Sequence, residues 1–340
     1  MREFKGYMHG INLGGWFSQC DHSIKRYDYF IQRDDFRRIA RWGFDHVRIP
    51  VDYELILDEK HHFKEDGFKR LDDCILWCKE NGLNMILDLH KTVGFSFDDG
   101  ENEDGFFVDE KYQQIFYDIW KEFARRYGHH AHLSFELLNE VSDASYCQKW
   151  NEIIRKAIET IRNEASEIPI IVGGYHNNSV WAVKDLDVPY DENVVYNFHC
   201  YNPLIFTHQG AYWVNGMDTS FRTPFEHSYS EYRRLSEEQM DIGRFDFFPE
   251  EDKIIDASYF EELFAEALQV AEERNVPLYC GEYGVIDRAD PAETLKWYAC
   301  IHEVFEKHHI GRAMWSYKEM DFGLVDAHYD PIRKELLEMK

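Results

Sequence analysis

Short apolar runs rich in β-branched and aromatic residues recur along the chain, and a segment of helical periodicity follows most of them. The runs cover residues 10–16, 45–50, 83–90, 133–140, 169–174, 194–201, 277–284 and 311–317. Between them, apolar residues recur at the spacing of one helix face, as in Phe68, Leu71, Ile75 and Cys78. Strands that alternate with helices indicate βαβ units and a parallel sheet.

Eight such units predict a closed (β/α)₈ TIM barrel rather than an open, doubly wound sheet. The stretch GINLGG at residues 10–15 is rich in glycine but lacks the GxGxxG spacing of a dinucleotide-binding loop. We therefore expect an α/β protein in which residues 1–340 form a single catalytic barrel.

One segment departs from this alternation of strands and helices. About fifty residues, from Thr207 to Asp256, separate the sixth strand from its helix, whereas such loops usually have about 2–6. The segment is dense in aromatic residues: Tyr212, Trp213, Phe221, Phe225, Tyr229, Tyr232, Phe245, Phe247 and Phe248. We expect an inserted subdomain at about residues 207–256, in which most rings form a small core. Trp213 is closest in sequence to the barrel mouth, so we expect it to be an exception to this packing role.

Composition excludes several classes of partner. The formal net charge of −26 argues against nucleic acid, because phosphates are met by Lys and Arg, and it fits an uncharged substrate. No run reaches the roughly 18 apolar residues of a membrane span, and residues 1–16 lack a secretory apolar core. We expect a monomer without membrane or nucleic-acid partners, secreted if a leader has been removed and otherwise cytoplasmic.

Cysteines and histidines do not form a metal signature. Seven scattered cysteines include Cys74 and Cys78 at helical spacing, but no second pair accompanies them at zinc spacing. The stretch GHHAH at residues 128–132 lacks any HExxH-type pattern. We predict free, mostly buried thiols and neither a metal nor a cofactor.

Polar residues at the carboxyl ends of the predicted strands are the candidates for chemistry, because active sites of such barrels form there. Two carboxylates, Glu140 on strand four and Glu282 on strand seven, come from nearly opposite sides and can flank one bond. Other candidates at strand ends are Arg48, His90, Asn139, His199, Tyr201 and Trp315.

Two carboxylates with an aromatic floor and no metal motif are typical of glycoside hydrolysis. One carboxyl group must donate a proton to the leaving oxygen while the other is ionised, and their surroundings drive the two pKa values apart. Arg48 and Tyr201 are suited to keep Glu282 ionised. Asn139 is suited to bind a sugar 2-hydroxyl, and Trp315 offers a flat apolar surface for a sugar ring.

The stretch HLSFELLNEV at residues 132–141 contains a second acid, Glu136. If the strand runs from 133 to 140, Glu136 and Glu140 share one face, since alternate residues point the same way. Only Glu140 then lies at the carboxyl end. We predict that Glu136 is a paired structural carboxylate deeper in the barrel and that Glu140 is the working one.

The motifs HVRIP, DLH, FELLNE, NFHCYNP, GEYG and WSY occur in this order over nearly the whole chain. Together they resemble glycoside hydrolase family 5 of the large retaining (β/α)₈ clan, closest to the clostridial endoglucanases with a helical insertion after strand six. The resemblance implies that Glu140 is the general acid/base and Glu282 the nucleophile. It also implies supporting roles for Arg48, His90, Asn139, His199, Tyr201 and Trp315, and substrate contact for Trp213.

The chain departs from the family pattern where two adjacent histidines often follow strand three, because His90 is followed here by Lys91. Lys91 can meet sugar hydroxyls or a neighbouring acid. The predicted function is a retaining endo-β-1,4-glucanase acting on cellulose-like or mixed-linkage β-glucans. A β-mannanase, a xyloglucanase, an exo-acting β-glucosidase and, more remotely, a non-hydrolytic glycan-binding barrel remain as alternatives.

Overall fold

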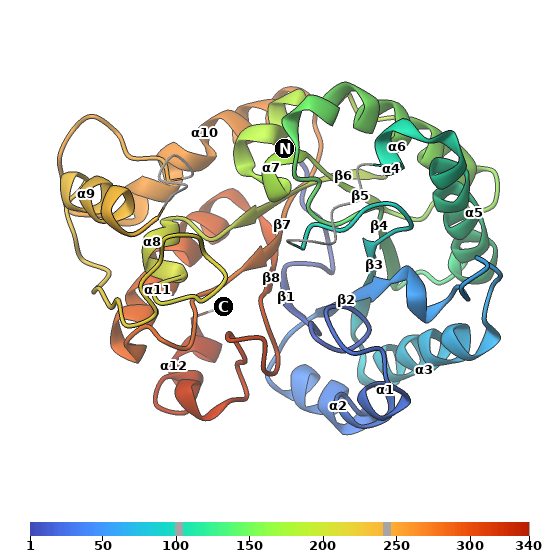
Figure 1. Cartoon of the computed structure of the whole chain (residues 1–340), viewed down its shortest axis with the longest axis horizontal. Coiled ribbons are helices and arrows are strands. Elements are labelled where there is room, and N and C mark those ends of the chain that lie inside the picture. Colours follow the sequence, from blue (N-terminus) through green and yellow to red (C-terminus); the bar gives the residue numbers. More distant parts are fainter. Residues whose placement is uncertain (99–104, 241–245, 340) are drawn as a thin grey trace.

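Eight parallel strands close into one barrel in the computed structural model, which describes residues 1–98, 105–240 and 246–339 (Figure 1). Residues 99–104 of the acidic stretch FDDGENEDGFF at residues 97–107 lie outside the described residues, as does Phe245 of the predicted insertion. Each strand pairs with its sequence neighbours, and the last pairs with the first, so the predicted TIM barrel is confirmed. The strands are β1 (His9–Asn12), β2 (His46–Asp52), β3 (Asn84–Lys91), β4 (Leu133–Glu136), β5 (Ile170–Gly173), β6 (Val194–Cys200), β7 (Leu278–Tyr283) and β8 (Gly311–Met314).

Helices surround the barrel and connect its strands. They are α1 (Ile24–Tyr29), α2 (Arg33–Arg41), α3 (Glu65–Asn81), α4 (Gly105–Val108), α5 (Glu110–Tyr127), α6 (Cys147–Arg162), α7 (Tyr175–Asn178), α8 (Leu204–Thr207), α9 (Tyr229–Gln239), α10 (Ala257–Glu273), α11 (Pro291–His308) and α12 (Arg333–Glu338). Short 3₁₀ segments lie at η1 (Tyr53–Leu55), η2 (Ala144–Tyr146), η3 (Val180–Asp185) and η4 (Ala327–Tyr329). Among the described residues, no helix is both long and apolar enough to span a membrane.

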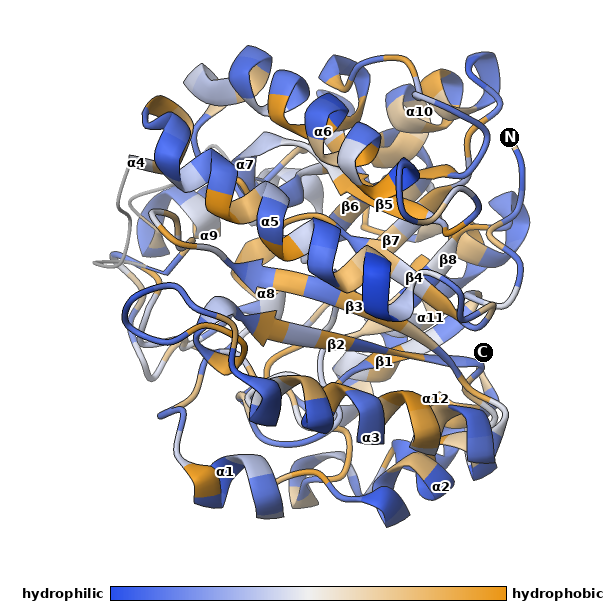
Figure 2. Ribbon diagram, turned by 90° about the vertical axis from the view of Figure 1, so that its right-hand side faces the viewer, coloured by the Kyte–Doolittle hydropathy of each residue, from blue (hydrophilic) through white to orange (hydrophobic). Residues whose placement is uncertain are grey.

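The apolar faces expected from the sequence pack against the barrel. Phe68, Leu71, Ile75 and Cys78 of α3 are all buried, as the periodicity predicted. Figure 2 shows apolar residues concentrated on the strands and on helix surfaces turned toward them, with hydrophilic residues toward the outside. A separate buried cluster joins Phe4 and Tyr7 to residues of β3, β5, β6, β7 and β8. Packing of this kind fills the barrel interior rather than leaving a pore.

Strand register brings polar residues together above this apolar layer. Asp88 on β3 pairs in register with Glu136 on β4, and His199 on β6 pairs with Glu282 on β7. A register shift between Phe198 and His199 accompanies the second pairing. Because all eight strands are parallel, their carboxyl ends meet at one mouth.

Three strands end three or four residues earlier than predicted, and the difference matters for the site. β1 ends at Asn12, β8 ends at Met314 before Trp315, and β4 ends at Glu136 rather than at residue 140. Beyond Glu136 the backbone N–H of Leu137 still bonds to β5 and that of Asn139 to β3, but Glu140 has a left-handed φ of +43°. The expectation that Glu140 shares a strand face with Glu136 is therefore wrong.

The segment between β6 and α10 contains α8 and α9, which lie at the left in Figure 1. Phe225, Tyr229 and Tyr232 are buried, and Tyr232 stacks on Phe248 with ring centroids 5.4 Å apart. The backbone N–H of Phe225 donates to Glu293 of α11 over 2.8 Å. These rings pack the segment together and against its neighbours, whereas Tyr212 and Trp213 are exposed.

Candidate active site

Arg48 lies at the centre of the polar layer and is fully buried. Its guanidinium donates to Glu136 through Nε and Nη2 over 2.7 and 2.8 Å, and Nη1 donates to Glu282 over 2.8 Å. Asp88 lies 3.0 Å from Nη2. The sequence analysis placed Arg48 at the end of its strand, but β2 continues to Asp52. Arg48 reaches the strand ends through its long side chain, not through its position in the strand.

Two asparagines complete the environment of Arg48. Asn12 and Asn139 each accept a hydrogen bond from the guanidinium through Oδ1, both over 2.9 Å. The Nδ2 of Asn139 is buried and has no hydrogen-bond partner among the described residues. A buried donor without an acceptor is costly, so this amide is suited to a substrate hydroxyl.

Glu282, on β7, accepts hydrogen bonds on both oxygens. Arg48 donates to Oε1, and the Tyr201 hydroxyl donates to Oε2 over 2.9 Å. Tyr201 follows directly after β6, and burial beside Glu282 raises its pKa well above the usual range. The neutral phenol therefore remains a donor, and together with the guanidinium it stabilises negative charge on Glu282.

Within the described part of the chain, the hydrogen bonds that Glu140 accepts come from two uncharged side chains. His199 Nδ1 lies 2.7 Å from Oε1, and Asn177 Nδ2 donates to Oε2 over 3.1 Å. Burial raises the pKa of Glu140 to about 7, and burial lowers that of His199 to about 4. Glu140 is thus protonated in a substantial fraction of molecules near neutral pH, next to a neutral imidazole.

The two carboxyl groups lie close to each other. One oxygen of Glu140, one of Glu282 and a ring nitrogen of His199 are all within 4.8 Å of one another. His199 Nδ1 is 3.7 Å from Glu282 Oε2. The imidazole therefore lies between two acids whose surroundings differ: one contacts a buried cation and the other does not.

The rings of His90 and Trp315 stack on each other. The two rings are nearly parallel, with an interplanar angle of 6° and centroids 6.1 Å apart. Asp88 Oδ2 holds His90 Nδ1 at 2.6 Å, and burial lowers the pKa of His90. Gly14 packs against the Trp315 indole, where a Cβ would lie 2.6 Å from a ring carbon. A side chain at position 14 would displace the indole.

Trp213 lies farther from the carboxylates, with 38% of its surface exposed. Its ring contacts His208 edge to face at 6.1 Å, and His208 contacts Tyr201 at 5.0 Å. A chain of aromatic rings thus connects Trp213 to the hydroxyl that binds Glu282. Lys91, for which the sequence left two interpretations, forms an ion pair with Glu54 over 3.2 Å.

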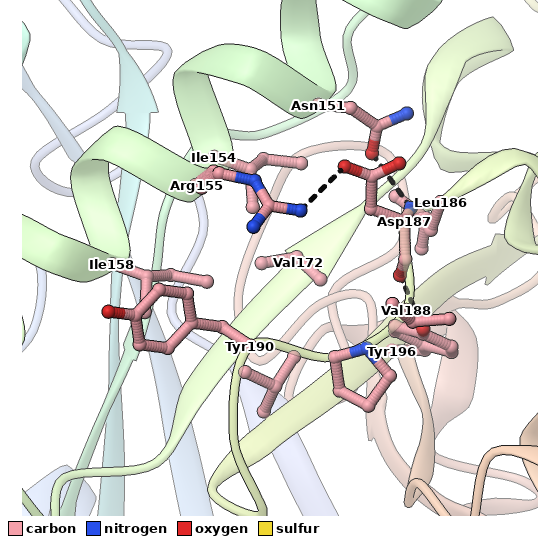
Figure 3. Close-up of a pocket in the computed structure, with 12 residues that line it drawn as sticks. Asn151, Ile154, Arg155, Ile158, Val172, Leu186, Asp187, Val188, Tyr190 and Tyr196 are labelled. Atoms are coloured by element: carbon pink, nitrogen blue, oxygen red, sulfur yellow. Dashed lines mark hydrogen bonds and ion pairs between the residues drawn. The ribbon is translucent and has the colours of Figure 1, made fainter.

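A hollow lies on the outer flank of the barrel, between α6 and the segment around residues 186–196 (Figure 3). Arg155 reaches Asp187 across it over 3.3 Å, and Asn151 accepts the Asp187 backbone N–H. Ile154, Ile158 and Val188 form its apolar surface. None of the predicted site residues lines it, so this hollow is separate from the paired carboxylates.

The structure brings together Arg48, His90, Asn139, Glu140, His199, Tyr201, Glu282 and Trp315, with Trp213 connected through His208. The sequence analysis missed Asp88, Asn12, Asn177 and Asn178. Strand alternation signals Asp88, because it lies two residues before His90 on the same face. The asparagines after β5 carry no such signal.

Comparisons with known proteins agree with this geometry. A family model described as cellulase (glycosyl hydrolase family 5) matches residues 8–321. Cellodextrinase A of Ruminococcus flavefaciens is 47% identical over 313 residues, 92% of this chain and 86% of that protein. Endoglucanase C of Acetivibrio thermocellus is 36% identical over 336 residues, 97% of this chain and 96% of that protein.

Solved structures lead to the same family. Cel5A of Thermotoga maritima in complex with cellobiose is 26% identical with a TM-score of 0.76, over 98% of this chain and 97% of that one. Cel5A in complex with mannotriose gives 26% identity and a TM-score of 0.75, over the same shares of each chain. The match spans the barrel and every strand that bears a site residue, and this chain belongs to the cellulase family, family 5 of the glycosyl hydrolases.

Proposed function

We propose that this glycoside hydrolase cleaves β-1,4-glucosidic bonds of cellulose-like or mixed-linkage β-glucans with retention of configuration. The observation that carries the proposal is that one oxygen of Glu140 and one oxygen of Glu282 lie within 4.8 Å of each other. Retaining enzymes place their carboxyl groups about 5–5.5 Å apart, whereas inverting enzymes leave about 6.5–9.5 Å for a water molecule. The short spacing supports direct attack by one carboxylate.

Glu282 is the proposed nucleophile. Its oxygens accept from Arg48 and Tyr201, which favours the ionised form that attacks the anomeric carbon. The attack forms a covalent glycosyl-enzyme while the bond to the leaving oxygen breaks. In the second step water attacks the same carbon and releases the Glu282 carboxylate.

Glu140 is the proposed general acid/base. With its pKa raised to about 7 by burial, it can donate a proton to the leaving oxygen in the first step. The resulting carboxylate then removes a proton from the attacking water. His199, neutral because burial lowers its pKa to about 4, donates to Glu140 without adding a positive charge that would favour early ionisation.

Substrate positioning falls to the groups around the two acids. We assign the unpartnered Nδ2 of Asn139 to the sugar 2-hydroxyl, a hydrogen bond that strengthens in the transition state. The indole of Trp315 and the neutral ring of His90 provide the surface for a sugar bound between the carboxylates. Residues 207–256 are proposed as an insertion on the active face, with Trp213 contacting a more distant sugar.

Soluble cello-oligosaccharides are the second candidate substrate class. The relative at 47% identity is named a cellodextrinase, whereas the one at 36% identity is named an endoglucanase. Both substrates contain the same bond, so the residues and roles proposed above apply to each. The length of chain accepted separates the two candidates, together with the exo-acting alternative.

The test measures reducing sugar released from carboxymethyl-cellulose, barley β-glucan, laminarin, glucomannan, xyloglucan, xylan and cellotetraose. Viscosity is followed in parallel, with Glu282→Ala as the inactive control. Release from the first two with a rapid fall in viscosity establishes an endoglucanase, and release from cellotetraose alone establishes a cellodextrinase. Preference for glucomannan or xyloglucan would move the substrate to another polysaccharide and contradict the glucan assignment. No release from any substrate would overturn hydrolysis itself.

A further inference from the structure

The chain after β5 has an unusual backbone. His176, Asn177 and Asn178 have φ values of +49°, +56° and +53°, so α7 is not a right-handed helix. Left-handed backbone costs roughly 1–2 kcal/mol per residue other than glycine, with asparagine among the more tolerant. Such conformations persist where surrounding contacts hold them, and they gather at functional sites. One of those contacts is the Asn177 N–H, which donates to the carbonyl of Val141, the residue after Glu140.

This backbone directs one side chain to Glu140 and the next to His199, which itself contacts Glu140. Asn177 Nδ2 donates directly to Glu140 Oε2 over 3.1 Å. Asn178, which is buried, places Nδ2 3.3 Å from His199 Nε2. His199 in turn holds Glu140 Oε1 through Nδ1 at 2.7 Å. Both oxygens of Glu140 are thus connected to the same short segment.

The proton positions on His199 follow from these contacts. Nδ1 faces oxygens of Glu140 and Glu282, which accept when ionised, so Nδ1 carries the hydrogen. A neutral imidazole has only one N–H, which leaves Nε2 with a lone pair. The matching partner for that lone pair is a donor, and Asn178 Nδ2 is one.

We propose that Asn177 and Asn178 are positioning residues that hold the Glu140 carboxyl group in the orientation required for proton transfer. Asn177 acts directly, and Asn178 acts by fixing the tautomer of His199. The inference rests on the role proposed above for Glu140 and deepens it. It also gives a reason for three consecutive left-handed residues at this point of the chain.

Asn177 is the member of the pair best suited to a test, because its removal changes no formal charge. The titratable and charged groups that face Glu140 come from strands β2, β3, β4, β6 and β7 and from Tyr201, which follows β6. They are Arg48, Asp88, His90, Glu136, His199, Tyr201 and Glu282. All of them remain when Asn177 is replaced. Losing a donor to the carboxylate destabilises its ionised form, so the pKa of Glu140 should rise.

The experiment compares Asn177→Gly with His176→Gly, its matched control. Both positions are left-handed, and glycine adopts that backbone without strain, so each variant removes only a side chain. Two substrates are used, 2,4-dinitrophenyl β-cellobioside and phenyl β-cellobioside. Dinitrophenolate departs without a proton, whereas phenolate requires one from Glu140.

For Asn177→Gly we expect kcat/KM on the phenyl substrate to fall about tenfold, with the dinitrophenyl substrate changed less than about twofold. The basic limb of the phenyl pH profile should move upward by about half to one pH unit. His176→Gly should match wild type in both measurements. Asn178→Asp, which turns an acceptor toward His199 Nε2, should lose more than about tenfold on the phenyl substrate.

Two results would overturn the proposal. Asn177→Gly could behave as His176→Gly does on both substrates, or it could lose activity equally on both with no shift in the pH profile. Wild type that hydrolyses neither cellobioside nor cello-oligosaccharides would instead refute the proposed function. The two failures are therefore distinguishable. Asn177 is exposed, so its replacement tests the idea even if the buried Asn178 variant does not fold.

Discussion

Glu136 and Glu140 lie four residues apart in one segment, yet they occupy two different electrostatic regions of the barrel. Glu136, at the end of β4, receives two hydrogen bonds from the Arg48 guanidinium and one from Asn197 over 2.9 Å. Glu140, just beyond the strand, receives its hydrogen bonds among the described residues from neutral His199 and from Asn177. Glu136 is fully buried and Glu140 is partly buried, and desolvation raises the pKa of each.

The difference between these regions indicates what each acid can do. A carboxylate that contacts a buried cation becomes part of an ion-pair network, where removing a partner leaves an uncompensated charge. A carboxyl group with only neutral donors keeps a proton near neutral pH and can exchange it with a substrate. Arg48 connects the regions, because Nη1 reaches Glu282 while Nε holds Glu136.

The largest expected effect is the loss of turnover when either carboxylate at the mouth of the barrel is removed. Glu282→Ala or Glu140→Ala should reduce kcat on β-glucan on the order of 10⁴-fold or more, while the fold is retained. Azide should partly restore Glu282→Ala and yield a glycosyl azide of inverted configuration, because the small anion occupies the space of the carboxylate. Reducing-sugar assays, circular dichroism and product NMR provide the measurements. Near-normal turnover in either variant would refute the assignment.

Replacing Glu136 should destabilise the fold more than replacing Glu140, although Glu140 is the residue expected to matter for turnover. Glu136→Gln removes one partner of the buried guanidinium and should lower the free energy of unfolding by about 2–4 kcal/mol. Glu140→Gln removes no contact to a cation and should change it by less than about 1 kcal/mol at pH 7. Urea unfolding monitored by tryptophan fluorescence gives both values. Equal destabilisation would mean that the contrast between the regions has no energetic basis.

The raised pKa of Glu140 has consequences for pH dependence. The basic limb of kcat/KM should fall with an apparent pKa near 7, because Glu140, the proposed general acid, deprotonates there. The folded state holds its proton more tightly than the unfolded state, so this group makes stability decrease as pH rises from about 4.5 to about 7. Asp88, raised by burial to about 7, acts in the same direction. The contribution of Glu140 is therefore obtained by measuring the free energy of unfolding of wild type and of Glu140→Gln across that pH range and taking the difference. An identical pH dependence in both would contradict it.

The smallest expected effect lies outside both regions, at Trp213. Trp213→Ala should raise KM about three- to tenfold and leave kcat nearly unchanged, since it removes the proposed sugar contact, which is remote from the reacting bond. Tyr190→Ala, which removes an exposed ring on the flank shown in Figure 3, is the matched control and should change neither constant. A fall in kcat with unchanged KM would place Trp213 in a different role.

The alternation of strand and helix signals by itself determined the barrel. It also indicated which residues would meet, because parallel strands in a closed barrel turn the same ends to the same mouth. Glu282, His199 and Tyr201 follow from that rule, since each lies at or directly after the carboxyl end of its strand. The contrast between a deep, paired Glu136 and an accessible Glu140 also came from the sequence.

Only the tertiary structure decided how these residues are connected. Arg48 reaches Glu282 from the middle of β2, although the two residues are 234 positions apart in the sequence. From its position in the strand alone, Arg48 would have been placed too deep in the barrel for this contact. The contacts of Glu140 with His199 and Asn177 depend on left-handed backbone at residues 140 and 176–178. None of these residues is a glycine, so nothing in the sequence signals that backbone conformation. Propensity and periodicity describe local geometry, whereas these contacts exist because packing of distant strands outweighs the local cost of the backbone.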